Sequence, residues 1–149
     1  MPDTNQYANL IPDSIEAASA IRIALVILAA GFLAITFLQS ALDKVFDYKG
    51  NLSFMKEQFS KTFLSNMIGF FLPIILICEL ITGITCVIGA IQIARGIDIY
   101  IVAFGFLFSG MTLLMLLFGQ RISKQYAGAV SLTGYFIIVL FGLIALSMH

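Results

Sequence analysis

Four long apolar segments, separated by short groups of charged residues, dominate the pattern along the chain. They comprise approximately residues 21–42, 67–94, 98–119 and 126–147. Because a helix rises ~1.5 Å per residue, about 20 apolar residues cross the ~30 Å hydrocarbon core of a bilayer. Each segment is a continuous apolar run and lacks the polar alternation of a membrane barrel strand. The pattern therefore predicts an all-α integral membrane protein built as a four-helix bundle.

The connections between the segments indicate how the predicted spans are arranged. Two linkers, residues 95–98 and 120–125, are short, and short connections make consecutive helices antiparallel neighbours. In the longer linker, apolar residues recur at helical spacing, with charged and polar residues on the opposite side. The apolar positions are Leu52, Met55, Phe59 and Phe63. We expect an amphipathic helix over about 52–65 at the membrane surface, which either seals the end of the bundle or docks a partner.

The first 20 residues differ from the rest because they are polar and acidic. Asp13 and Glu16 indicate a helix start just before the first span. A cleavable signal peptide has basic residues before a short apolar core, whereas here Arg22 comes late and the apolar run is of full length. We expect a polar segment of residues 1–20 and a membrane domain of residues 21–149 that keeps its first span.

The composition excludes several classes of function. The 149 residues are 60% hydrophobic and 11% charged, against roughly 25% charged residues in a soluble domain, and the formal net charge is +0. Without a net basic field, nucleic-acid binding is excluded. Two cysteines and one histidine exclude a disulfide scaffold, a Cys/His zinc site and a haem held by two histidines. We expect no metal site, and we interpret Cys78 and Cys86 as core residues, because about 12 Å of helix separates them.

Basic residues are distributed unequally between the two ends of the predicted bundle. Six lie near the end that holds the long linker, and two, Arg22 and Arg95, lie near the other end. The six are Lys44, Lys49, Lys56, Lys61, Arg121 and Lys124. Loops rich in lysine and arginine stay in the cytoplasm. The distribution predicts a cytoplasmic long linker and both termini on the outer side, which is the periplasm in a bacterium with two membranes.

Glu79 carries the charge that lies deepest in any predicted span. An ionised carboxylate in hydrocarbon is costly unless it is paired, solvated or protonated, and such residues are usually functional. Counting ~1.5 Å per residue places Tyr135, Ser109 and Thr112 of other spans at a similar depth. We predict a buried polar layer in which Tyr135 or Ser109 hydrogen-bonds Glu79. The carboxylate then binds a ligand or handles protons, or it only clamps helices together.

Four polar residues cluster at the end of the first span, on the side toward which Glu79 is displaced. They are Gln39, Ser40, Asp43 and Lys44. Either they form a polar mouth to the buried layer, or Asp43 and Lys44 anchor the helix at the lipid headgroups.

Some of these residues also carry a resemblance to a known family. Residues 39–46 (Gln-Ser-Ala-Leu-Asp-Lys-Val-Phe), the linker that follows, and residues 79–83 (Glu-Leu-Ile-Thr-Gly) make the chain resemble the DoxX-like family and its MauE-type redox-associated relatives. The resemblance extends approximately from residue 21 to residue 146. Ser40 or Ala41 stands where the family usually has glycine. The paired cysteines of its thiol-handling members are missing, which argues against dithiol chemistry.

The resemblance implies a four-helix accessory subunit of a respiratory or redox complex in the bacterial inner membrane. It implies roles for three residues: Glu79 as a buried acceptor or proton carrier, Lys44 as a charge at the mouth, and Gly83 as a packing residue. The sequence holds no ligand set for haem, flavin or iron–sulfur clusters and no nucleophile set, so we do not expect an enzyme on its own. Quinone or another chain would carry any redox chemistry, and the partners would be other membrane subunits and the lipid bilayer.

Two other interpretations stay open. Distant relatives of the DoxX-like family in eukaryotes resemble sterol-binding or receptor-assembly proteins. A non-catalytic lipid- or isoprenoid-binding protein, or a membrane-protein assembly factor, is therefore the main alternative. A small transporter in which Glu79 carries protons ranks last, because four spans are few for alternating access.

Overall fold

The computed structural model describes the backbone of residues 4–148 and the side chains of residues 14–148. Every regular element in this range is helical. The elements are α1 (Thr4–Phe46), α2 (Tyr48–Gln58), the short 3₁₀ helix η1 (Ser65–Met67), α3 (Ile68–Ala94), α4 (Tyr100–Ile122) and α5 (Tyr126–Ser147). The predicted all-α fold class is confirmed.

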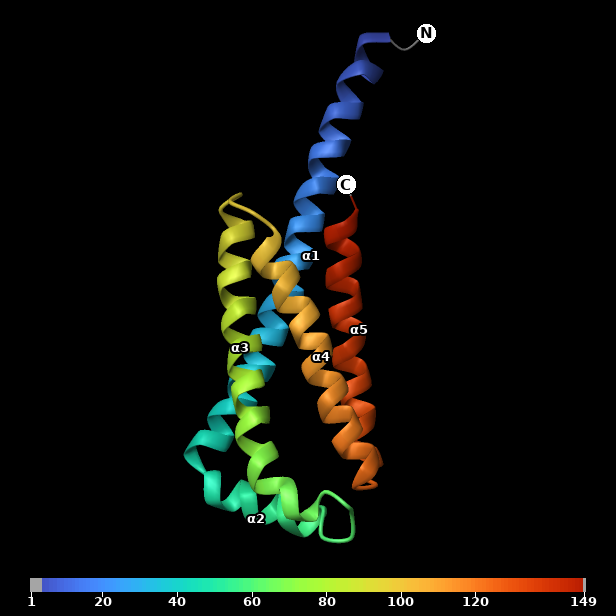
Figure 1. The fold of residues 1–149 in the computed structure, drawn as a ribbon. Helices are drawn as coiled ribbons and strands as arrows, with labels where there is room; N and C mark the ends of the chain where they lie inside the picture. Colours follow the sequence, from blue (N-terminus) through green and yellow to red (C-terminus); the bar gives the residue numbers. More distant parts are fainter. Residues whose placement is uncertain (1–3, 149) are drawn as a thin grey trace.

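Within the described residues, α1, α3, α4 and α5 are long and apolar enough to cross a membrane. They run alternately down and up, so that consecutive spans are antiparallel (Figure 1). α1 packs against α3 and α5, and α4 packs against the same two helices. The four helices therefore close a ring, which confirms the predicted four-helix bundle.

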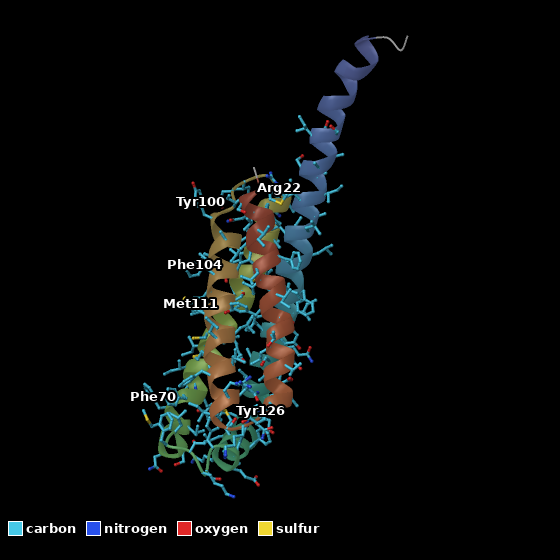
Figure 2. All side chains as sticks on the ribbon, turned by 90° about the vertical axis from the view of Figure 1, so that its right-hand side faces the viewer. Arg22, Phe70, Tyr100, Phe104, Met111 and Tyr126 are labelled. Carbon is cyan, nitrogen blue, oxygen red and sulfur yellow. The ribbon has the colours of Figure 1, made fainter. Side chains whose placement is uncertain are left out.

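The outer surface of the bundle is apolar. Tyr100, Phe104 and Met111 point outward from α4 (Figure 2), and more than half of each residue is exposed. An apolar exterior is unfavourable in water but matches the hydrocarbon of a lipid bilayer. The exposed residues Tyr100 and Tyr126 lie at opposite ends of the bundle, as do the aromatic belts of proteins at the two membrane interfaces (Figure 2). The exterior and the helix lengths together indicate a membrane protein.

Glycine residues let the helices approach closely where the core is tightest. A Cβ atom on Gly83 of α3 would lie 2.5 Å from Cγ and 3.2 Å from the backbone nitrogen of Leu38 in α1. A Cβ atom on Gly89 would lie 2.5 Å from Cα of Val102 in α4. Close approach through small residues holds membrane helices together, because lipid is as apolar as their side chains. Gly83 lies where α3 packs on α1.

Helix α1 begins at Thr4 and continues without a break into the first span. This start lies well before the one predicted near Asp13 and Glu16. Residues 13–22 contain three alanines and neither glycine nor proline, and alanine is the strongest helix former. The helix projects beyond the bundle (Figure 1). Near this end of the bundle, the Arg22 guanidinium donates a hydrogen bond to the Met148 carbonyl and ties α1 to the end of α5.

The helix between the first two spans begins and ends earlier than predicted. α2 comprises Tyr48–Gln58 rather than residues 52–65, and turns follow before η1. Asp47 fixes its start, because Oδ1 accepts a hydrogen bond from the Gly50 amide at 3.0 Å. The predicted apolar stripe does not continue, since Phe59 is buried but Phe63 is 77% exposed. α2 lies across the end of the bundle opposite the chain termini (Figure 1).

Candidate functional site

The centre of the candidate site is Glu79, a buried carboxylate within α3. Two residues of α1, Ser40 and Lys44, meet it from the neighbouring helix. They are four residues apart, so both side chains lie on one face of α1, where it packs on α3. The Ser40 hydroxyl donates to Glu79 Oε1 at 2.9 Å, and Lys44 Nζ donates to the same oxygen at 3.0 Å.

The Lys44 ammonium group is surrounded by more acceptors than it can serve. It donates to Glu79 Oε1, to the Ser40 carbonyl at 3.2 Å and to the Ser40 hydroxyl at 2.8 Å. Glu79 Oε2 also lies 2.9 Å from Nζ and is attracted by its charge, but it is not aligned for a hydrogen bond. An ammonium has three protons and four oxygens surround this one. Among the described residues, Glu79 Oε2 is thus held by its ion pair with Lys44.

The pair is deeply placed for two charged side chains. Only 15% of the Lys44 side chain and 1% of the Glu79 side chain are exposed. Each charge compensates the other in a medium where neither is tolerated alone. Lys44 also lies in the last turn of α1, where a cation interacts favourably with the helix dipole. Lys44 thus points toward Glu79, and the interpretation of Asp43 and Lys44 as headgroup anchors stays a prediction.

A chamber of about 310 Å³ opens beside this pair at the end covered by α2. Its wall includes Ser40, Lys44 and Glu79, together with the amide side chains of Asn51, Gln58 and Gln120. Gln120 Oε1 is a second buried oxygen that accepts no hydrogen bond within residues 14–148. The chamber wall thus contains two buried acceptor oxygens, of which Glu79 Oε2 is paired with Lys44 and Gln120 Oε1 has no donor among the described residues.

An apolar cavity of about 90 Å³ adjoins the chamber; we call it the annex. The two share wall residues of α2, α3 and α4 and the segment after α2. The shared residues are Met55, Phe59, Ile75, Met115 and Gly119. The rest of the annex wall is apolar too, including Phe71 and Phe118. A polar chamber with an apolar annex can hold a molecule that has a polar head and an apolar end.

Hydrogen bonds hold α2 over the chamber. Gln58 Nε2 donates to the Ser123 hydroxyl at the end of α4 at 3.0 Å. Asn51 Nδ2 donates to the backbone carbonyls of Asp47 at 2.9 Å and Asp43 at 3.3 Å. These bonds attach the short helix to the end of α1 and to the end of α4, so α2 forms one wall of the site as well as its cover.

Tyr135 and Ser109 do not contact Glu79 as predicted. The Ser109 hydroxyl donates to the Gly105 carbonyl at 2.7 Å and lies 3.6 Å from the sulfur of the buried Cys86. The Tyr135 ring packs edge-on against Phe32, with 5.6 Å between ring centroids. Cys86 is about 10 Å farther along α3 than Glu79. Residue counts give a rough depth along each helix, but they do not show which face of the helix a side chain lies on.

Thr112 belongs to a separate helix contact next to the site. Its hydroxyl lies 3.1 Å from the hydroxyl of Thr82, and a carbonyl of its own helix lies within hydrogen-bond distance of each. Because a hydroxyl has one proton, one threonine donates to the other, and the second donates to the carbonyl of its own helix. Thr82 is three residues from Glu79, so the threonine pair clamps α3 to α4 about one turn away from the carboxylate. Thr112 was predicted to belong to the polar layer around Glu79, whereas no polar role was predicted for Thr82.

Of the four residues predicted to form a mouth, two reach the chamber. The side chains of Gln39 and Asp43 are exposed and do not line it, whereas Ser40 and Lys44 do. Successive residues of a helix are ~100° apart, so a run of polar residues does not share one face. The amides of Asn51, Gln58 and Gln120 were missed, because isolated polar residues near span ends carry no distinctive sequence signal.

Comparisons with known proteins give no relative for this chain. No family model, no curated protein and no solved structure matches it. The similarity of residues 39–46 and 79–83 to the DoxX-like family therefore stays a prediction from the sequence.

Proposed function

We propose that the protein is a ligand-binding accessory subunit of a redox complex in the bacterial inner membrane, and that its chamber receives the head of a quinone-class lipid. One observation carries this proposal. In a bundle with an apolar exterior, the chamber wall contains the buried Glu79 carboxylate, which is ion-paired with Lys44. Carboxylates inside membranes are rare and usually functional, and concave sites with a few polar groups bind small molecules.

The size and lining of the chamber support a ligand with a small polar head and an apolar tail. Its volume of about 310 Å³ lies at the lower end of the range of about 300–1,000 Å³ typical of small-molecule sites. Glu79, Lys44 and Ser40 face the head, and the annex faces the start of the tail. Quinone-class lipids combine a ring with two oxygen substituents and an isoprenoid tail. The polar chamber beside the Glu79–Lys44 pair and the apolar annex fit such a molecule.

When bound, the quinone-class lipid supplies the redox chemistry, and the residues of this chain bind and orient it. Ser40 and Lys44 hold the Glu79 carboxylate in a constant position in the chamber wall. α2 closes the chamber and limits the access of water. A partner subunit exchanges the electrons in this proposal, as the DoxX-like resemblance of residues 39–46 and 79–83 implies.

The proposal is tested by identifying the lipids that copurify with the protein. Purification from bacterial membranes in mild detergent, followed by lipid extraction and mass spectrometry, should show a quinone-class lipid enriched over its share of membrane lipids. The double variant Lys44→Met with Glu79→Leu replaces the pair by apolar side chains, which buried ion pairs often tolerate, and should lose the enrichment. Glu57→Gln alters an exposed carboxylate of α2 and should keep it. Only bulk phospholipid on the wild type would contradict ligand binding.

The accessory role has its own test in the same preparation. Protein mass spectrometry of the native complex should detect an oxidase or dehydrogenase subunit in constant ratio to this chain. Recovery of the chain without any redox subunit, from membranes that contain such complexes, would contradict the accessory role but leave the lipid site intact.

A second candidate function is supported by the annex. Its wall is apolar, and in this respect it suits any isoprenoid or sterol-like chain as well as the tail of a quinone. A non-catalytic lipid-binding protein or assembly factor would carry such a lipid, or a client helix, without a redox partner. Enrichment of another lipid class, or of a membrane protein outside redox complexes, would favour this function.

A further inference from the structure

A further cavity, of about 280 Å³, lies at the end of the bundle opposite the chamber; we call it the terminal cavity. Its wall is formed by α1, the end of α3, the linker before α4 and the end of α5. Among the described residues, none lines both this cavity and the chamber or the annex. Most of the wall is apolar, including the buried residues Val26, Ile93 and Ala145, but it also holds Arg22 and Asp98. The terminal cavity thus combines apolar walls with one cation and one anion.

Arg22 and Asp98 do not neutralise each other. Both residues are half-buried, yet they form no ion pair with each other or with any other residue of 14–148. A half-buried charge is costly unless water or an opposite charge compensates it. Because the two charges share one cavity but do not pair, each is available to an external group of the opposite sign.

Both side chains also keep polar atoms that a ligand can reach. Arg22 Nη1 donates to the Met148 carbonyl, whereas the other guanidinium nitrogens have no acceptor among the described residues. Asp98 Oδ1 accepts a hydrogen bond from the Tyr100 amide at 3.0 Å, and Oδ2 accepts none from residues 14–148. These remaining atoms are accessible, because the buried side-chain atoms without a hydrogen bond all belong to other residues. A guanidinium matches the oxygens of a phosphate, and a carboxylate accepts hydrogen bonds from an ammonium.

The terminal cavity lies at the level of the lipid heads. Arg22 and Tyr100 lie at the same end of the bundle (Figure 2), and the exposed Tyr100 ring marks the membrane interface there. A phosphoethanolamine head carries a phosphate and a primary ammonium, which fit Arg22 and Asp98. A phosphocholine head has the same two charges, but its cation has no N–H to donate. A phosphoglycerol head has no cation at all.

We propose that the terminal cavity binds a phospholipid with a phosphoethanolamine head, with the phosphate on Arg22, the ammonium on Asp98 and the start of the acyl chains against the apolar wall. This site is separate from the proposed quinone-class site and does not depend on it. A lipid bound there contacts α1, the α3–α4 linker and α5, and so links the ends of three spans.

The proposal is tested by native mass spectrometry of the wild-type protein released from nanodiscs. The nanodiscs contain equal amounts of phosphatidylethanolamine, phosphatidylcholine and phosphatidylglycerol with the same acyl chains. The ethanolamine lipid should stay bound about three- to tenfold more often than either of the others. Equal retention of the choline or glycerol lipid, or no bound lipid, would overturn the proposal. Excess soluble glycerophosphoethanolamine should not displace the lipid, and displacement would overturn the assignment to a lipid.

Substitutions locate the bound lipid. Asp98→Asn removes the charge, keeps an oxygen for the Tyr100 amide and should abolish the preference for the ethanolamine over the glycerol lipid. Arg22→Gln should lower the retention of all three lipids. Arg95→Gln and Glu16→Gln change exposed charges near the same end that do not line the cavity, and they should keep the wild-type pattern. The wild-type pattern in both cavity variants would overturn the proposal, and the comparison of lipids on the wild type requires no variant to fold.

Discussion

Removing one member of the Lys44–Glu79 pair should destabilise the fold far more than removing both. Glu79→Leu leaves a buried ammonium without its partner, and Lys44→Met leaves a buried carboxylate without its partner. A lone charge of this kind costs about 3–5 kcal/mol. The double variant has neither charge, and replacing a whole buried pair by apolar side chains ranges from neutral to stabilising by about 1–4 kcal/mol.

The distance between the charges sets the scale of the coupling free energy. Nζ and Oε2 are 2.9 Å apart, and an effective dielectric constant of about 20 gives an attraction of about 6 kcal/mol. Partial exposure of Lys44 lets solvent screen part of this attraction. We therefore expect a coupling free energy of about 3–5 kcal/mol between the two substitutions.

The assay is reversible unfolding by a denaturing detergent in mixed micelles. It compares the wild type, Lys44→Met, Glu79→Leu and the double variant. The free energy of unfolding should fall sharply in each single variant and return close to the wild-type value in the double variant. Glu57→Gln changes a carboxylate on the exposed side of α2 and should stay within about 0.5 kcal/mol of the wild type. Two small, additive single effects would refute the claim that Lys44 and Glu79 are a mutually dependent pair.

Three further outcomes are expected. Gly83→Ala should destabilise the bundle by about 1–3 kcal/mol in the same unfolding assay. Gly31→Ala should not, because a Cβ atom at Gly31 would have no other atom within 4 Å. Equal effects of the two substitutions would contradict close packing of α1 on α3. The cycle of Thr82→Val and Thr112→Val should give a coupling of about 0.6 kcal/mol, and strict additivity would refute the clamp. If the long linker is cytoplasmic, Ser53→Cys on α2 should react with a membrane-impermeant maleimide only after the cells are opened, and labelling of intact spheroplasts would reverse the orientation.

Much of the fold was predictable because the hydropathy pattern directly indicates the number and positions of the apolar spans. A helix that crosses hydrocarbon must be apolar over its whole length, so the charged residues mark where spans end. The boundaries of α2 were less predictable. Asp47 caps the helix earlier than the apolar stripe suggested, and the chain turns after Gln58 while apolar residues continue to Phe63. Periodicity shows that a face is apolar but not where the helix stops.

The candidate site was predictable in part. Glu79 stands out because a carboxylate is costly inside a membrane, and the resemblance to the DoxX-like family drew attention to Lys44. Their contact could not be deduced from depth, since it depends on how α1 and α3 are rotated about their axes. Counting residues therefore favoured Tyr135 and Ser109, which lie on other faces.

The most direct test of Glu79 as part of a quinone-class binding site is infrared difference spectroscopy of the protein in lipid, before and after addition of a short-chain benzoquinol. If the ligand head binds beside the Glu79–Lys44 pair, a carboxylate stretching band should shift in the wild type and in Glu57→Gln. That shift should be missing from the double variant Lys44→Met with Glu79→Leu. The same band shift in the double variant, or quinol binding to the wild type without any carboxylate shift, would contradict the assignment of Glu79 as the ligand-binding group.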